Sequence, residues 1–186
     1  FLIGILENTR LGIGEMSLDE TPSPYLSGLM DVFFEDNAIP LLESNRGCPY
    51  SCSFCQQGTK YFSKIRFFDG GRIHDEMLYI AKRREELGVH IVIVEFADPN
   101  FGQYSQDLDT FKGIKNTQDL FDFPSQVWCS TGKSQAKRIM AHAKMLKPGS
   151  IMIRAAMQSM NPETLSEVER KNLPKDVFEN FSKDGV

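Results

Sequence analysis

Residues 89–98 read Val-His-Ile-Val-Ile-Val-Glu-Phe-Ala-Asp, and this stretch decides how the rest of the chain is interpreted. From Val89 to Phe96 the run is almost continuously β-branched, which is typical of a parallel strand covered on both faces. His90 and Glu95 interrupt it, and it is far shorter than a membrane span. We therefore predict a buried strand of an α/β protein, followed by a long polar loop that holds Asp98 to Phe101.

Strand and helix patterns alternate on either side of this strand. Gly88 ends a helical pattern, and Asn161 with Pro162 begins another as N-cap and first helical residue. We expect strands over residues 39–43, 126–130 and 151–158, and helices over 73–87, 134–146, from 162 onward and over 175–183. Alternation of this kind predicts a parallel sheet. Four such units fit a partial (β/α) barrel better than a finished doubly wound sheet, although periodicity does not separate the two.

The composition is that of an ordinary globular domain. The chain has 186 residues, of which 41% are hydrophobic and 25% charged, and its net charge is −4. No basic field attracts nucleic acid or an anionic membrane, so we expect neither as a partner. The chain starts without an initiator Met or a signal peptide, and we interpret it as an internal piece of a longer, cytoplasmic protein.

Three cysteines, Cys48, Cys52 and Cys55, lie within eight residues directly after the first expected strand. Without secretory features, such a cluster favours a metal site over disulfides. In parallel α/β folds the chemistry lies at the carboxyl ends of the strands, which is where this loop is expected. Three thiolates can converge on three corners of an iron–sulfur cubane. Such clusters normally take four cysteines, so one iron would stay open to another ligand.

The spacing Cys-x-x-x-Cys-x-x-Cys, with Phe54 before the last cysteine, resembles that of the radical S-adenosylmethionine (radical SAM) enzymes. Further segments resemble the subgroup that carries a cobalamin-binding domain, and the match runs from about residue 20 to about residue 175. These segments are residues 22–26, 39–42, 45–49, 157–159, 161–165 and 170–172. The resemblance implies that residues 1–37 are a linker or the margin of an upstream cobalamin-binding domain. Residues 38–186 would be the N-terminal part of the radical SAM core, a truncated barrel with its first four βα units.

The resemblance also implies a chemistry. Cys48, Cys52 and Cys55 would hold a [4Fe-4S] cluster whose open iron binds S-adenosylmethionine. The reduced cluster would cleave this cosubstrate to a 5′-deoxyadenosyl radical, or support cobalamin-dependent methyl transfer, on an unknown substrate. An electron donor such as flavodoxin or ferredoxin would be a partner. Cobalamin itself would be bound by a domain before residue 1, because this chain lacks the Asp-x-His-x-x-Gly motif.

The same resemblance suggests four contacts to S-adenosylmethionine. Phe54 would contact the adenine. Asp98 stands where these enzymes normally carry a Gly-Gly-Glu segment for the methionine amino group, and it is a candidate substitute. Gln158 and Ser159 end the fourth expected strand and would hydrogen-bond the ribose or the methionine carboxylate.

Two other functions stay open at this point. One is a methylthiotransferase-like radical SAM enzyme, which would carry a further cysteine trio upstream. The other is a non-catalytic zinc or iron–sulfur binding module. Zinc would need a fourth ligand, and His74, His90, His142 and Cys129 lack finger-like spacing to the triplet. We also expect the isolated chain to be poorly soluble, since an open half-barrel exposes a strand edge.

Overall fold

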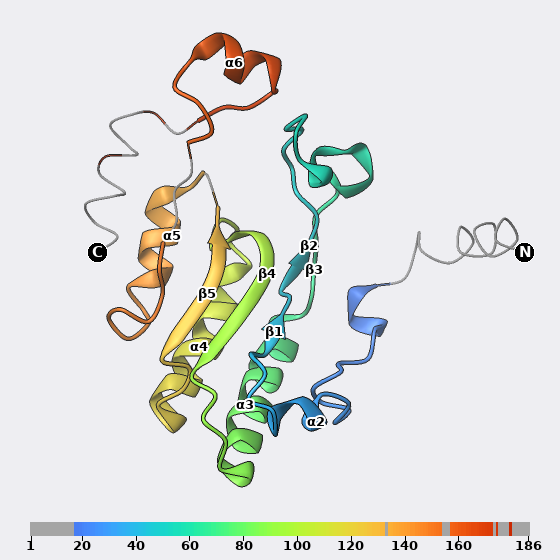
Figure 1. The fold of residues 1–186 in the computed structure, drawn as a ribbon, viewed down its shortest axis with the longest axis vertical. Helices are drawn as coiled ribbons and strands as arrows, with labels where there is room; N and C mark the ends of the chain where they lie inside the picture. Colours follow the sequence, from blue (N-terminus) through green and yellow to red (C-terminus); the bar gives the residue numbers. More distant parts are fainter. Residues whose placement is uncertain (1–16, 133, 154–156, 173, 175–178, 180–186) are drawn as a thin grey trace, which may run out of the picture.

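A parallel three-stranded sheet forms the centre of the computed structural model, which describes residues 17–132, 134–153, 157–172, 174 and 179 (Figure 1). Its strand order is β1 (Leu41–Leu42), β4 (Ile93–Phe101) and β5 (Gln126–Thr131). In the register, Leu42 lies opposite Phe96, and Phe96 lies opposite Cys129. The prediction of a mixed α/β fold with a parallel sheet is confirmed.

A second, antiparallel pair of strands lies beyond the end of β1. It consists of β2 (Asn45–Arg46) and β3 (Arg66–Phe67). The loop between them contains two short 3₁₀ helices, η2 (Gln56–Gly58) and η3 (Lys60–Phe62). This loop carries the three clustered cysteines. Strands β2 and β3 are the segments through which the loop leaves the body of the molecule and returns to it.

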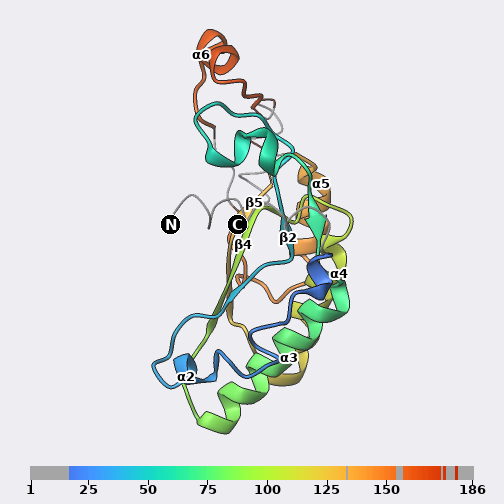
Figure 2. The ribbon, with the colours of Figure 1, turned by 90° about the vertical axis from the view of Figure 1, so that its right-hand side faces the viewer.

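Three helices follow the strands of the main sheet. They are α3 (Gly70–Leu87), α4 (Asp107–Phe121) and α5 (Ala136–Ala143). At the start of α3 the Asp69 side chain accepts a hydrogen bond from the Gly71 N–H at 2.8 Å, and Gly88 ends the helix in the left-handed region at φ +63°. Figure 2 shows all three helices on the same side of the sheet.

Shorter helices lie toward the two ends of the described chain. Before β1 come η1 (Leu18–Glu20) and α2 (Asp31–Phe34), and α6 (Pro162–Glu167) follows the sheet. The side chain of Asn161 caps α6 as the sequence predicts, accepting from the N–H groups of Glu163 and Thr164. No helix in the described parts of the chain is long and apolar enough to cross a membrane.

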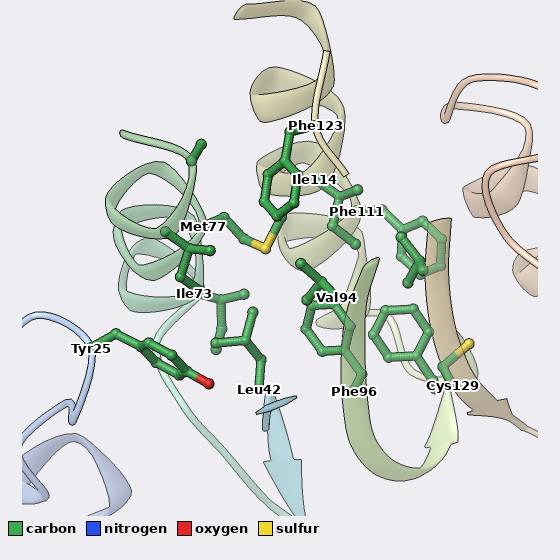
Figure 3. Packing of buried hydrophobic residues seen from close by; sticks show 14 of the residues in the cluster. Tyr25, Leu42, Ile73, Met77, Val94, Phe96, Phe111, Ile114, Phe123 and Cys129 are labelled. Atoms are coloured by element: carbon green, nitrogen blue, oxygen red, sulfur yellow. The ribbon is translucent and has the colours of Figure 1, made fainter. Parts of the chain in front are cut away.

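The hydrophobic core fills the space between one face of the main sheet and helices α3 and α4 (Figure 3). Val94 and Phe96 of β4 point into it, together with Phe111 and Ile114 of α4. The opposite face carries Glu95 and other exposed residues. These are Leu41, Ala97, Gln126, Trp128 and Ser130. The prediction that β4 is covered on both faces is therefore wrong for this chain, because all three large helices pack on one side.

The structure corrects several expected boundaries. β4 begins at Ile93 instead of Val89, and it does not end at Phe96 but continues through Phe101, so Asp98 belongs to a strand instead of a loop. Helix α4 occupies a stretch for which the sequence analysis predicted no helix. The expected helix 134–146 is shorter, and of the expected strand 151–158 the described residues show one bridge, from Ile151 to Val127. The expected helix 175–183 lies outside the described residues except for residue 179.

Candidate functional site

The cysteine loop is held in a compact turn by its own backbone. The N–H of Cys48 donates to the carbonyl of Phe62 at 2.8 Å, which joins the two arms of the loop. At the tip, the N–H of Cys55 donates to the carbonyl of Cys52 at 3.0 Å, and the N–H of Gly58 donates to the carbonyl of Cys55 at 2.9 Å. Cys52 and Cys55 therefore begin two consecutive turns, and Cys48 is held across the loop against Phe62.

Two glycines allow the chain to fold this closely. Gly47 has φ +113°, and a Cβ there would lie 2.6 Å from the carbonyl oxygen of Lys64. A Cβ at Gly58 would lie 2.3 Å from the carbonyl oxygen of Cys52. Both distances are far below a van der Waals contact, so the path of the loop requires glycine at both positions.

The three thiols differ in their surroundings. Cys48 and Cys52 are buried and Cys55 is exposed, and none of the three forms a disulfide. Within the described ranges, no group of three or more His, Cys, Asp or Glu side chains is arranged to hold a metal ion. The predicted convergence of the three sulfurs is thus not seen in this structure, although the three thiols share one loop.

Asp98 connects strand β4 to the segment that leads into the cysteine loop. Its side chain is 1% exposed and accepts hydrogen bonds from the N–H of Ser44 at 3.0 Å, the hydroxyl of Ser44 at 2.8 Å and the N–H of Asn45 at 2.9 Å. Burial raises the pKa of Asp98 to about 7, against the opposing effect of these donors. These bonds join β4 to the segment at the base of the loop, and the contact of Asp98 to S-adenosylmethionine stays a prediction.

Asn100 follows Asp98 on the same face of β4 and reaches the loop itself. Its Nδ2 donates to Sγ of Cys48 at a distance of 3.4 Å, and its side chain is 1% exposed. Tyr104 lies close by, and its pKa is raised, first by burial and then by the charge of Cys48. The phenol therefore stays neutral beside the sulfur.

Gln103 anchors the other side of the loop. The hydroxyl of Tyr50 lies 2.9 Å from Oε1 of Gln103 and 3.0 Å from Oγ of Ser134. The N–H of Ser134 donates to the same Oε1 at 3.2 Å, and Arg138 donates to the Gln103 carbonyl at 2.8 Å. Tyr50 of the loop is thereby joined to the ends of both β4 and β5.

The remaining predicted contact residues lie around this centre. Phe54 is 54% exposed at the tip of the loop, and Gln158 is exposed. Ser159 is half-buried, and its hydroxyl accepts from the N–H of Asn161 at 3.0 Å. The N–H of Ser53 donates to the carbonyl of Val168 at 3.2 Å, so the segment after α6 touches the cysteine loop. The ligand contacts predicted for Phe54, Gln158 and Ser159 stay predictions.

Two characterised proteins are similar to this chain. The cobalamin-dependent radical SAM methyltransferase TokK from Streptomyces tokunonensis is 31% identical over 170 residues, which cover 87% of this chain. The 2-(S-pantetheinyl)-carbapenam-3-carboxylate methyltransferase of Streptantibioticus cattleyicolor is 31% identical over 173 residues, or 88% of the chain. The chain is a relative of the radical SAM enzymes. It spans about a quarter, 24%, of the length of each of these proteins. No protein-family model matches it.

The donor set of the loop fits the iron–sulfur cluster that radical SAM enzymes carry. Thiolate is the usual ligand of such clusters, and the loop offers three free thiols on a folded segment of eight residues. The hydrogen bond from Asn100 to Cys48 is also of a kind that supports a bound cluster, because hydrogen bonds to sulfur are among the features that set its properties.

The sequence of this chain did not identify Asn100, Gln103 or Tyr50 as residues of the site. A signal for Asn100 was present, since residues 98 and 100 must point to the same face once the strand extends beyond Phe96. No local pattern indicates Gln103 or Tyr50, because the side-chain partners that join them to the loop and to β5 lie 31 to 84 residues away in the sequence.

Proposed function

We propose that this chain forms the N-terminal part of a radical SAM core and that Cys48, Cys52 and Cys55 hold its [4Fe-4S] cluster. The observation that carries the proposal is the folded loop with three free thiols, placed just beyond the carboxyl end of the first parallel strand. Similarity to a radical SAM methyltransferase over 87% of the chain supports it. When bound, the cluster and S-adenosylmethionine supply the electron and the radical or methyl group of the reaction.

Several side chains in the described parts of the chain hold this loop in place. Asp98 holds its base through Ser44 and Asn45. On the far side of the loop, Gln103 fixes Tyr50. These hydrogen bonds hold the segments that carry the loop, while the three sulfurs would still have to converge when the cluster binds.

We infer that the sheet is the first part of a β/α barrel. The main strands follow one another in chain order, and the bridge from Val127 to Ile151 places the next segment beyond β5. Helices α3, α4 and α5 lie on the same side (Figure 2), as they do around a barrel. A doubly wound sheet would carry helices on both faces. The exposed face with Leu41 and Trp128 would then be the interior of the complete barrel.

The most specific part of the proposal is cobalamin-dependent methyl transfer to an unknown substrate, and the names of the two relatives support it. Cobalamin would be bound by an upstream domain, with residues 1–37 as its linker or margin and residues 38–186 as the radical SAM core. A small protein such as flavodoxin or ferredoxin would deliver the electron.

The cluster is tested on the full-length protein, purified and reconstituted without oxygen. We expect about four irons and four sulfides per chain and a visible absorption band. Cys52→Ala should lose both, whereas Cys129→Ala, which removes the thiol outside the loop, should retain them. Zinc without sulfide would overturn the proposal.

The reaction is tested separately with S-adenosylmethionine and a reductant. Release of 5′-deoxyadenosine or of S-adenosylhomocysteine would support the radical SAM assignment, and the second product identifies methyl transfer. About eight irons per chain would instead indicate the methylthiotransferase class with its second cluster. A cluster that yields neither product with any substrate tried would leave a non-catalytic binding module.

A further inference from the structure

We propose that Asn100 tunes the iron–sulfur cluster by donating a hydrogen bond from Nδ2 to the sulfur of Cys48. The inference rests on the proposed function, because it requires Cys48 to be a cluster ligand. It assigns Asn100 as a positioning residue, which acts on the cluster through the sulfur. The observation behind it is the distance of 3.4 Å between the side-chain nitrogen and Sγ.

The position of Asn100 makes this bond persistent. The residue lies on β4 between Pro99 and Phe101 and is 1% exposed, so water does not compete for its side chain. Its carbonyl accepts from the N–H of Gln103 at 3.2 Å, and Gln103 is in turn held by Arg138. The donor is therefore fixed by the backbone at its own position and by the turn that follows.

The sulfur is equally well held. Cys48 is buried, and its N–H donates to the carbonyl of Phe62 across the loop. Gly47 before it allows an approach to Lys64 that no other residue could make. Donor and acceptor thus come from segments that are each anchored independently, and their contact is a consequence of the fold.

The consequence for a bound cluster follows from its charge. Reduction adds one negative charge, part of which resides on the cysteine sulfurs, so the reduced state accepts the hydrogen bond more strongly than the oxidised state. In a buried site of low dielectric this difference is larger than in water. Asn100 therefore stabilises the reduced cluster, and its removal should make the cluster harder to reduce.

The test is a potentiometric titration of the reconstituted full-length protein, followed by electron paramagnetic resonance. Asn100→Leu keeps a similar volume and removes the donor. The comparison is made at the potential where half of the wild-type cluster is reduced. At this potential we expect the ratio of oxidised to reduced cluster in Asn100→Leu to be about threefold to tenfold higher than in the wild type, where tenfold equals 59 mV for one electron. Thr117→Val is the matched control, because it removes a buried hydrogen bond within α4 and should leave the ratio unchanged.

The outcomes separate this inference from the proposed function. If the wild-type protein binds no cluster, both fail. If all variants bind a cluster and Asn100→Leu titrates like Thr117→Val, the role of Asn100 alone is wrong. Should Asn100→Leu not fold, Asn100→Asp decides, since its carboxylate replaces the donor by an acceptor and should lower the potential at least as much. If neither variant folds with a cluster, Asn100 acts in folding only and the inference is overturned.

Discussion

Gly58 lies directly against the backbone of Cys52, and a Cβ on Gly58 would be 2.3 Å from the Cys52 carbonyl oxygen and 3.1 Å from its nitrogen. The contact brings η2 back onto the middle cysteine, so the shape of the cysteine loop depends on a residue that has no chemistry of its own. No flexible side chain is available to move aside, because both contacting atoms belong to the backbone.

We therefore expect Gly58→Ala to reduce the iron and sulfide content of the reconstituted full-length protein several-fold, while the rest of the fold persists. The added methyl group must push the loop away from Cys52. Gly88→Ala is the control, because its Cβ would meet no atom within 4 Å and the change adds only backbone strain at the end of α3. Equal iron content in both variants would show that the loop tolerates the displacement.

A second prediction concerns the pH dependence of stability. The pKa of Asp98 is raised from 3.8 to about 7, mainly by burial. Between these two values the folded chain retains a proton that the unfolded chain releases, so the free energy of unfolding should fall as the pH rises from about 4 to about 7. Asp107, with a pKa raised to about 6 by burial, acts in the same direction.

Urea denaturation at several pH values measures this effect. Asp98→Asn should flatten the fall in stability between pH 5 and pH 7, although the variant should be less stable at low pH because it disturbs the bonds to Ser44 and Asn45. Asp109→Asn, at an exposed carboxylate, should leave the slope as it is. A wild-type stability that rises over this interval would contradict the burial of a shifted Asp98.

The third prediction concerns the anchor between the loop and strands β4 and β5. Tyr50→Phe removes the hydroxyl that contacts Gln103 and Ser134, and we expect a loss of about 1 kcal/mol in stability. Hydrogen–deuterium exchange should become faster in residues 48–55. Tyr61→Phe removes a hydroxyl from a residue that is 72% exposed, so it should change neither quantity. Identical exchange in the two variants would show that the Tyr50 hydroxyl does not anchor the loop.

The fourth prediction tests the proposed barrel. Leu41 is 54% exposed on the face of the sheet away from α3 and α4, and in a complete barrel this face would be the interior. Leu41→Lys should then lower the melting temperature and the soluble yield of the full-length protein, because a buried unpaired charge is costly. Leu120→Lys introduces the same charge at a residue of α4 that is 63% exposed, and it should have little effect. Equal behaviour would indicate that the sheet face stays open in the whole protein.

Helix α4 shows why part of the fold could not be predicted. Its buried face includes Phe111 and Ile114, but also Thr110, Thr117 and Gln118, so the apolar pattern is too sparse to indicate a helix. Two of the polar members have hydrogen-bond partners within the fold: the Thr117 hydroxyl donates to the Gly113 carbonyl, and Nε2 of Gln118 donates to the Pro124 carbonyl. A polar residue is stable inside when such partners exist, and these partners are known only from the tertiary structure.

The sequence by itself determined the features that depend on neighbours in the chain. These are the presence of the central strand, the end of helix α3 at Gly88, the cap of α6 and the spacing of the three thiols. Only the tertiary structure decided that Asp98 meets Ser44, 54 residues away, and that Asn100 meets Cys48, 52 residues away. Local propensities and caps act over a few residues, whereas the partners across a sheet follow from the register and packing of whole strands.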